Sequence, residues 1–345
     1  MNRFRCLLLL LVGLLLAGCL PAQTTLINPQ PPALTDEIQQ TLASLRQVDD
    51  HPLFTMTYYG AYDLNLPAPP AASQNVPGWA CSLFVTFADP AQPIFARNFD
   101  WQQAPALLLF TDPPDGYASV SMVDISYLGY DESSLDKLRS VEGKQDLLYA
   151  PRIPFDGMNE HGLVVGMAAV DPTAIPSDPQ KPTVGSLRII RLMLDRTKTV
   201  EEALTLFQQY NVDFSGGPPI HYLVADQTGH SAVIEYKAGE LRITHGDAPW
   251  QVATNFYLAD STPAQRQADR RYNRLDTALT EVAGKAGLTE AMTLLADVAQ
   301  RHTRWSIVYG MKSGAVWLTT SKRYETIHEF QLAMALAEQY YFMIG

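Results

Sequence analysis

The sequence predicts a layered α+β domain. Runs in which apolar and polar residues alternate, as in half-buried strands, recur from residue 81 to residue 320. Helical patterns interrupt these runs, and two of them follow one another over 262–283 and 289–300. Strand runs separated by helix pairs are typical of α+β domains with stacked layers. With 345 residues and 47% hydrophobic content, the chain can bury one large core or two modest ones.

Ahead of residue 81 the sequence predicts a helix, a strand and a linker. Thr35 is placed to cap a helix over 35–48 that has acidic residues in its first turn. The aromatic and β-branched residues of 52–62 favour a strand. The prolines of 66–80 exclude regular structure, so we expect an exposed linker that leads directly to Cys81.

From Cys81 onward the chain begins with two short strands joined by a turn at 89–93. Asn159 opens a turn that leads into a buried strand ending near Val170. The remaining predictions are a helix over 199–210 with Thr199 and Glu202 as a capping box, two strands within 221–236, the helices already named, and a hairpin over 305–320 that turns at 312–314.

Charge and histidine spacing disfavour several function classes. A net charge of −11 and a pI near 5.0, without clustered Lys and Arg, argue against a nucleic-acid partner. No metal-ligand spacing occurs among His161, His221, His230 and His302. Two of these, His221 and His230, bracket a hairpin, where simple exposure is one interpretation. The glycines of 215–219 lack the lysine and helix start of a phosphate-binding loop. We therefore expect neither a metal nor a cofactor.

The N-terminus has the pattern of an export signal. Arg3 and Arg5 precede an apolar run, which ends in Leu16-Ala17-Gly18-Cys19. This ending resembles a bacterial lipobox, which implies cleavage before Cys19 and lipidation of that cysteine. The alternative, a transmembrane anchor, needs about 20 apolar residues, and the run is well below that length. We expect an exported protein held to the membrane by lipid, with residues 1–18 as the signal peptide.

Cys81 is left without a cysteine partner if the signal peptide is removed and Cys19 carries lipid. Two interpretations fit a lone thiol in an oxidising compartment: a buried structural cysteine, or a nucleophile that is protected because it is used. The predicted hairpin folds Arg97 and Asp100 back beside Cys81. A guanidinium group lowers the pKa of a nearby thiol, and a carboxylate can hold an ammonium group, which favours the nucleophile.

Four motifs in order resemble one family. They are Cys81 with Arg97-Asn98-Phe99-Asp100-Trp101, then Asn159-Glu160-His161-Gly162-Leu163, then Thr254-Asn255-Phe256, and then Arg270-Arg271-Tyr272-Asn273-Arg274. Together they resemble the linear amide C–N hydrolases: choloylglycine hydrolases and penicillin V acylases, with acyl-CoA:6-aminopenicillanate acyltransferases and acid ceramidase-like amidases as relatives. The resemblance implies an N-terminal nucleophile (Ntn) hydrolase fold, a four-layer αββα sandwich in which the catalytic cysteine begins the mature chain.

The resemblance also implies a role for each matched residue. Cys81 is the nucleophile, and its own α-amino group is the base. Arg97 favours the thiolate, and Asp100 holds the α-amino group. Asn255 stabilises the tetrahedral intermediate through its side-chain N–H, and Arg271 is the second arginine near the nucleophile. An ordinary cation on a helix surface is the alternative for Arg271, and a structural role is favoured for Asn159.

One departure concerns specificity. The bile-salt enzymes carry another asparagine or a tyrosine after the Asn-Glu-x-Gly-Leu motif, where this chain has Met167-Ala168-Ala169-Val170. A preference for bile salts or penicillin V is therefore in doubt, and the second donor to the oxyanion is a backbone N–H or an unidentified group. The aromatic residues that we consider for an acyl pocket are Trp79, Phe99, Trp101, Phe256, Tyr257 and Trp305.

These inferences divide the chain into a signal peptide (1–18), a lipid-anchored tether and propeptide (19–80), and a catalytic domain (81–345). Cleavage before Cys81, by the chain itself or by a protease, frees the α-amine. The strand at 52–62 would hold the fragments together, and otherwise the catalytic fragment would leave the membrane. The predicted function is hydrolysis of a small-molecule acyl amide through an acyl-enzyme. The alternatives are an acyltransferase of the same fold and an inactive lipid-anchored binding protein.

Overall fold

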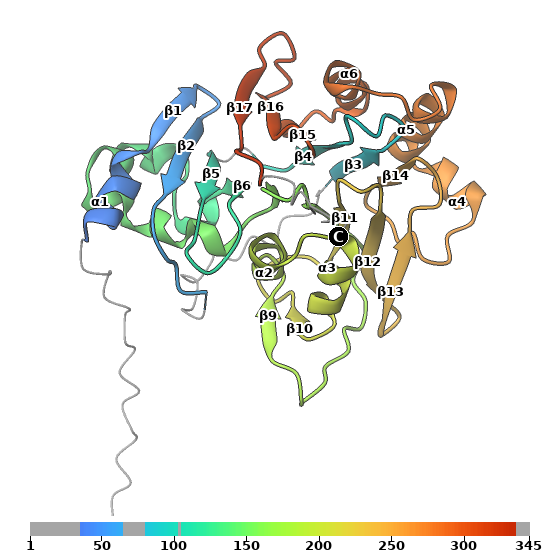
Figure 1. Ribbon diagram of the computed structural model, residues 1–345, viewed down its shortest axis with the longest axis horizontal. Helices are drawn as coiled ribbons and strands as arrows, with labels where there is room; N and C mark the ends of the chain where they lie inside the picture. The colour runs from blue at the N-terminus through green and yellow to red at the C-terminus, as the bar shows by residue number, and fades with distance from the viewer. Residues whose placement is uncertain (1–34, 65–79, 103–104, 336–345) are drawn as a thin grey trace, which may run out of the picture. The chain divides into compact units, whose positions relative to one another are not determined.

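The computed structural model describes residues 35–64, 80–102 and 105–335. The expected signal peptide, the lipidated Cys19 and most of the proline-rich linker lie outside these residues. In the described part of the chain, the helices are too short or too polar to cross a membrane. Figure 1 shows the arrangement of helices and strands.

The larger sheet has nine strands, all antiparallel to their neighbours except β2 and β5, which run parallel. In spatial order they are β1 (Arg46–Asp49), β2 (Leu53–Tyr58), β5 (Ala106–Thr111), β6 (Ser119–Asp124), β7 (Asp156–Asn159), β8 (Val164–Ala169), β11 (Ile220–Ala225), β12 (Ser231–Lys237) and β13 (Glu240–His245). The central strands β6, β7, β8 and β11 are buried along their whole length. Burial on both faces shows that this sheet is an inner layer.

The second sheet has six antiparallel strands. In spatial order they are β14 (Trp250–Ala253), β3 (Ala80–Thr86), β4 (Ile94–Asp100), β15 (Thr303–Gly310), β16 (Ala315–Thr320) and β17 (His328–Gln331). The predicted hairpin from Cys81 is confirmed as β3 and β4, which are joined by a turn that contains Asp89 to Pro93. A short parallel pair, β9 (Thr183–Gly185) and β10 (Asn211–Asp213), stands apart from both sheets.

Helices cover the outer face of each sheet. The α-helices are α1 (Asp36–Ala43), α2 (Arg188–Arg196), α3 (Val200–Phe207), α4 (Pro263–Ala268), α5 (Arg270–Glu281) and α6 (Leu288–Val298), and the 3-10 helices are η1 (Ile125–Leu128), η2 (Glu132–Arg139) and η3 (Glu142–Arg152). α2 and α3 pack on the nine-stranded sheet, and α5 and α6 on the six-stranded sheet. The four-layer αββα sandwich is confirmed.

The two sheets meet where β8 crosses β3. Gly166 of β8 makes this approach possible, because a Cβ atom added there would lie 2.7 Å from Leu83 Cδ2 and 2.9 Å from Phe95 Cζ. Contacts that short do not occur between real carbon atoms, so a larger residue would push the sheets apart. The core between the sheets includes Cys81 itself.

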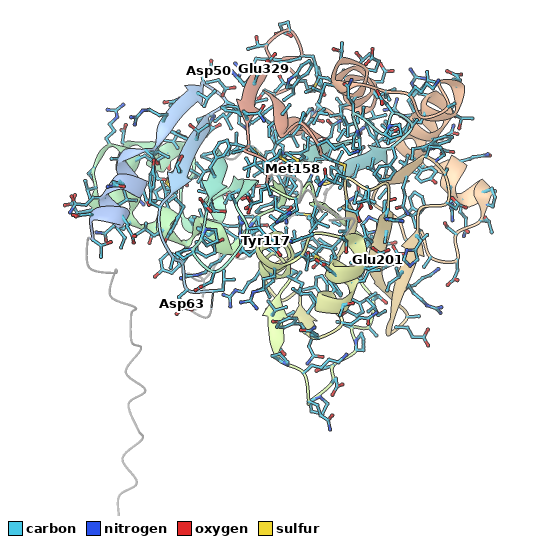
Figure 2. The ribbon with its side chains drawn as sticks, in the orientation of Figure 1. Asp50, Asp63, Tyr117, Met158, Glu201 and Glu329 are labelled. Carbon is cyan, nitrogen blue, oxygen red and sulfur yellow. The ribbon has the colours of Figure 1, made fainter. Side chains whose placement is uncertain are left out.

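The segment before Cys81 is part of the folded body. β2 confirms the predicted strand, but the predicted helix over 35–48 is wrong at its end, because α1 stops at Ala43 and β1 begins at Arg46. Asp49 explains the strand: it accepts hydrogen bonds from Thr320 of β16 at 2.6 Å and from His328 of β17 at 3.1 Å. Figure 2 shows the neighbouring residues Asp50 and Glu329 at this junction. A tertiary contact therefore overrides the local helical pattern.

The later predictions hold with small changes. The strands of 221–236 are β11 and β12, and the hairpin over 305–320 is β15 with β16. Thr199 caps α3 by accepting from Glu202 N at 3.2 Å, although the Glu202 carboxylate accepts from Lys198 N rather than closing a capping box on Thr199. The helix over 262–283 is divided into α4 and α5 at Asp269, which caps α5 through its side chain.

Candidate active site

Cys81 is the second residue of β3, at one end of the six-stranded sheet, and its side chain is fully buried. β3 and β4 pair so that Cys81 lies opposite Phe99 and Ala80 lies opposite Asp100. The hairpin therefore returns Arg97 and Asp100 to the neighbourhood of Cys81, as the spacing predicts. Ala80 and Cys81 are consecutive residues of β3, so Cys81 N is a peptide nitrogen in this structure.

Arg97 contacts the sulfur of Cys81. Its Nη2 atom lies 3.4 Å from Cys81 Sγ, while Nη1 donates to the carbonyl of Phe155 at 2.8 Å and to Asp156 Oδ2 at 3.0 Å. Burial raises the pKa of the Cys81 thiol, and the charge of Arg97 opposes this rise without overcoming it. The thiol form is therefore favoured at neutral pH in this structure.

Asp156, at the start of β7, is a site residue that the sequence reasoning missed. It is fully buried and bound to Arg97, and it also accepts hydrogen bonds from the Tyr309 hydroxyl and, at 3.4 Å, from Trp305 Nε1. These contacts fix the guanidinium group against the sulfur. The available signal was an acid in an otherwise apolar strand, three residues before Asn159.

Asp100, at the end of β4, holds an unused acceptor. Its Oδ1 accepts from the Thr303 hydroxyl, whereas its buried Oδ2 has no hydrogen-bond partner in the structure as described, with Arg271 Nη1 3.9 Å away. Burial raises the pKa of Asp100 to about 6, against the opposing effects of Thr303 and Arg271. A buried carboxylate oxygen without a hydrogen-bond donor is costly, which makes Asp100 unusual among the described acids.

Asn255, just after β14, holds the backbone of Cys81. Its Oδ1 accepts from Cys81 N at 2.6 Å and from Arg271 Nη1 at 3.0 Å, and its Nδ2 donates to the carbonyl of Ala169 at 2.7 Å. Two donors on one side and one acceptor on the other fix the orientation of the amide. In the uncut chain, the N–H expected to stabilise an oxyanion is thus bonded to the end of β8.

Arg271 lies in the first turn of α5 and also binds the backbone of Cys81. Its Nη1 donates to the backbone carbonyl of Cys81 at 2.6 Å. Asp269 places it, because the Asp269 side chain caps α5 and its Oδ2 lies 3.5 Å from Arg271 Nη2. Arg271 is therefore not an isolated surface cation. The structure brings together all five residues that the sequence singles out, namely Cys81, Arg97, Asp100, Asn255 and Arg271.

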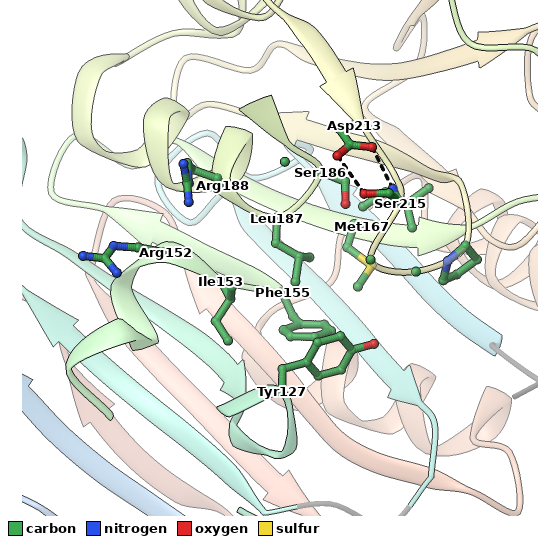
Figure 3. A pocket seen from close by; sticks show the side chains of 15 residues that line it. Tyr127, Arg152, Ile153, Phe155, Met167, Ser186, Leu187, Arg188, Asp213 and Ser215 are labelled. Carbon is green, nitrogen blue, oxygen red and sulfur yellow. Dashed lines mark hydrogen bonds between the residues drawn. The ribbon is translucent and has the colours of Figure 1, made fainter. Parts of the chain in front are cut away.

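A cavity of about 300 Å³ is linked to this cluster through Phe155 and Met167, although none of the five site residues lines it. Most of its wall is apolar, with Tyr127, Phe155 and Met167 on one side (Figure 3). Phe155 provides the carbonyl that Arg97 binds, and Met167 lies two residues before Ala169, which binds Asn255. The cavity wall and the groups around Cys81 are therefore connected through Phe155 and through β8.

A model of the acyl-coenzyme A:6-aminopenicillanic acid acyl-transferase family matches residues 147–322, just over half of the chain. The chain belongs to this family. The matched residues include Asn255 and Arg271, whereas Cys81, Arg97 and Asp100 precede them.

Solved structures support the same fold for this family member. Penicillin V acylase from Agrobacterium tumefaciens superimposes with a TM-score of 0.52 and 18% identity, covering 73% of this chain and 86% of that chain. A mutant of the conjugated bile acid hydrolase from Clostridium perfringens superimposes with a TM-score of 0.52 and 17% identity, covering 73% of this chain and 92% of that chain. At these identities the likeness shows the fold, which is that of the Ntn hydrolases.

A curated relative is an uncharacterized protein of Paramecium bursaria Chlorella virus 1, which is 32% identical over 108 residues. The match covers 29% of this family member and 38% of the viral protein. This chain therefore spans less than two fifths of that relative's length in the alignment.

Next to the loop that carries Asn255, this acyltransferase-family chain has a buried pair, His221 and Glu235. The sequence offered exposure as an interpretation of His221, and the structure corrects it. His221 is fully buried, not exposed: its Nε2 donates to the carbonyl of Thr254 at 2.7 Å, and its Nδ1 lies 3.0 Å from Glu235 Oε2. Glu235 in turn accepts from the backbone N–H groups of Leu258 and Ala259. The pair therefore fixes both ends of the loop that carries Asn255.

The structure also tests the expected structural role of Asn159 and the aromatic residues considered for a pocket. The Asn159 side chain donates to the carbonyls of Leu194 and Thr197 and accepts from two backbone N–H groups of its own turn, which agrees with a structural role. Among the described residues considered for an aromatic pocket, none lines this cavity, and Phe99, Trp101 and Trp305 lie in the core, which is the default interpretation of these residues. Phe99 and Trp305 stack on each other in the core, at 3.9 Å between ring centroids, and Tyr127 and Phe155 line the cavity instead. Trp79 lies outside the described residues.

Within the described ranges, one group of possible metal ligands comes together: Glu201, Asp226 and His230. The Asp226 carboxylate already accepts from Val200 N at 2.9 Å and from Thr228 N at 2.9 Å. These bonds give Asp226 a structural role, as the anchor of the turn between β11 and β12 and of the start of α3.

Proposed function

We propose that the chain is a cysteine Ntn hydrolase that cleaves a linear, non-peptide amide through an acyl-enzyme on Cys81. One observation carries the proposal: three polar side chains hold three different atoms of the same residue. Arg97 contacts the sulfur, Asn255 the backbone nitrogen and Arg271 the backbone oxygen. A structural cysteine needs none of these contacts.

The reaction begins with cleavage between Ala80 and Cys81, which turns the backbone N–H of Cys81 into a free α-amino group. The usual pKa of an α-amino group, about 8, lets this group take the thiol proton near neutral pH. The unpaired Oδ2 of Asp100, opposite Ala80 in the sheet, accepts a hydrogen bond from the resulting ammonium group. Arg97 stabilises the thiolate, because its guanidinium already lies against the sulfur.

The thiolate attacks the amide carbonyl, and the oxygen of the tetrahedral intermediate takes the negative charge. The second N–H of Asn255 Nδ2 donates to this oxygen, while the first keeps its bond to the Ala169 carbonyl. The C–N bond breaks, the amine leaves with the proton from the α-ammonium group, and the acyl group remains on sulfur as a thioester. Water, deprotonated by the α-amine, then attacks the thioester and releases the acid and the thiol.

The N-terminal fragment stays bound after cleavage in this proposal. β2 pairs with β5 over six residues, and the Tyr62 hydroxyl donates to Asp195 at 2.8 Å. Asp49 connects the same fragment to β16 and β17. With lipid on Cys19, the fragment tethers an exported enzyme to the membrane. If the fragments instead separate, the catalytic part is released.

The family match favours a second candidate, an acyltransferase in which an amine rather than water accepts the acyl group. The two activities share every step up to the thioester. Incubating the acyl-enzyme with an added amine separates them, because a transferase forms the new amide faster than the free acid.

The test of the proposal is hydrolysis of a panel of acyl p-nitroanilides by the purified full chain, beside Cys81→Ser and Cys81→Ala. We expect the unaltered chain to release nitroaniline. We also expect the fragment that begins at Cys81 to gain the mass of the acyl group. Absence of both the product and the adduct, together with no selective reaction of Cys81 with iodoacetamide in the cut protein, would favour the inactive binding protein instead.

A further inference from the structure

The cavity that Phe155 and Met167 link to the Cys81 cluster has an apolar body and a basic end. Ile153 and Leu187 continue the apolar wall formed by Tyr127, Phe155 and Met167. Beyond these two residues, Arg152 and Arg188 lie on the same side of the cavity, as Figure 3 shows. A ligand that fills the cavity therefore contacts hydrocarbon along its body and two guanidinium groups at one end.

Arg152, at the end of η3, has an unused donor. The residue is only 4% exposed, and its Nη1 is buried without a hydrogen-bond partner among the described residues. Its Nε donates to the backbone carbonyl of Asp63 at 2.7 Å, and its guanidinium lies 4.6 Å from the centre of the Tyr149 ring. These contacts hold the group in place and leave one N–H direction for a ligand.

Arg188, in the first turn of α2, adds a second positive charge. Burial lowers the pKa of both arginines, and the charge of Arg188 adds to the lowering at Arg152. Two like charges kept close together in a partly buried place cost free energy, and an anion between them offsets that cost. An arginine pair also suits the fork geometry of a carboxylate.

One acid of the chain already lies near this pair. Asp63 is exposed, and its carboxylate attracts both Arg152 and Arg188. It stands on the N-terminal side of the proposed cleavage site, and Figure 2 labels it. At the other end of the cavity, the acid Asp213 is occupied by Ser215, whose N and Oγ donate to it at 2.9 and 2.7 Å. The basic character is thus confined to the end with Arg152 and Arg188.

We infer that the substrate's acyl part is an apolar chain or ring that ends in an anionic group, and that Arg152 and Arg188 bind this group. The inference rests on the proposed function, because the cavity takes an acyl group only if Cys81 attacks the amide. It names the chemical class of the acid that the enzyme releases: a dicarboxylic acid, or an apolar acid with another anion at its far end.

The test compares two matched series of p-nitroanilides, made from straight-chain monocarboxylic acids and from α,ω-dicarboxylic acids of the same lengths. The measured quantity is the ratio of kcat/KM for the dicarboxylic substrate to that for its neutral partner. We expect a ratio above about ten at the best length, since a hydrogen-bonded charge pair typically contributes that much. A sulfonate-ended series shows whether the site requires a carboxylate.

Three variants and one control sharpen the test. Arg188→Gln and Arg152→Gln lower the ratio toward one. Arg188→Glu makes the protein prefer acyl groups that end in an ammonium group, a gain that misfolding cannot produce. Asp63→Asn raises the ratio, because a competing acid is removed. Arg139→Gln, on an exposed arginine of η2, leaves the ratio unchanged.

The outcomes separate this inference from the proposed function. If neutral anilides are cleaved as well as dicarboxylic ones, and Arg188→Glu prefers no new substrate, the inference is wrong and the hydrolase stands. If neither series is cleaved and no acyl adduct forms on Cys81, the proposed function fails, and the inference fails with it.

Discussion

Arg271 donates a hydrogen bond to the backbone carbonyl of Cys81, a residue 190 positions earlier in the chain. The contact joins the start of α5 to the start of β3, and the same guanidinium nitrogen binds Asn255. A helix residue therefore fixes the backbone on which the proposed nucleophile sits. Cys81 is therefore held by its main chain as well as by its side chain.

Replacing Arg271 tests this relationship. Arg271→Met removes a charged donor, which typically costs about 1.5–3 kcal/mol, so we expect kcat to fall by about tenfold to a hundredfold. Arg271→Lys should recover only part of the loss, because an ammonium group cannot bind Cys81 and Asn255 in the same geometry. Steady-state kinetics decide. An Arg271→Met protein with unchanged kcat would remove Arg271 from the site.

The buried ion pair of Arg97 and Asp156 predicts a large effect on stability. Asp156→Leu leaves a buried, unpaired guanidinium group, so the free energy of unfolding should fall by about 3–5 kcal/mol. The double variant Arg97→Met with Asp156→Leu should recover much of it, because no charge is left without a partner. Urea unfolding in a Cys81→Ala background measures both. If the double variant is as unstable as the single one, packing rather than charge explains the loss.

Asp100 predicts a pH dependence of stability in the uncut chain. Its pKa rises from 3.8 to about 6 on folding, so the folded chain keeps a proton that the unfolded chain loses. The free energy of unfolding should therefore fall as pH rises from 4 to 6, by up to about 3 kcal/mol, and stay level above 6. Comparing Cys81→Ala with Cys81→Ala/Asp100→Asn isolates this contribution. Identical pH profiles for the two proteins would contradict it.

The same group predicts the pH dependence of self-cleavage, if Asp100 assists the attack of Cys81 on the preceding carbonyl. The rate should rise as pH passes through about 6, where the carboxyl loses its proton. Asp100→Asn should cleave slowly at every pH. The measurement is the fraction of cut chain over time. A rate that is independent of pH in the unaltered chain would assign the cleavage to another group or to a protease.

Replacing His221 should change kcat through the loop that carries Asn255. His221→Ala leaves the Thr254 carbonyl without its donor, so the loop should move and kcat should fall with little change in KM. His221→Gln keeps a side-chain N–H and should restore part of kcat. A loss of folded protein in both variants, with normal kcat per correctly folded molecule, would give His221 a purely structural role.

The sequence predicts the parts of the site that are local. Cys81, Arg97 and Asp100 lie on one hairpin, so their spacing alone brings them together. Asn255 and Arg271 enter only through the family resemblance, because no periodicity links residues this far apart. Asn255 and Arg271 reach Cys81 because β14 and α5 pack against β3.

The roles of Asp156 and His221 were not predicted from the sequence, for a related reason. Each is a polar residue inside a buried strand, and its partners, Arg97 and Glu235, come from other strands. A strand pattern identifies such a residue as unusual but does not say what it binds. The end of α1 was missed for the same reason, since Asp49 is fixed by Thr320 of β16 and His328 of β17, which lie 271 and 279 residues later.

The most direct test of the account is intact mass and N-terminal sequencing of the purified protein beside Cys81→Ala. The account predicts a fragment that begins at Cys81 in the active unaltered protein, with the N-terminal fragment still bound, and an uncut Cys81→Ala chain. An intact chain through Ala80 and Cys81 in fully active protein would contradict it, because the α-amino group of Cys81 would then not exist.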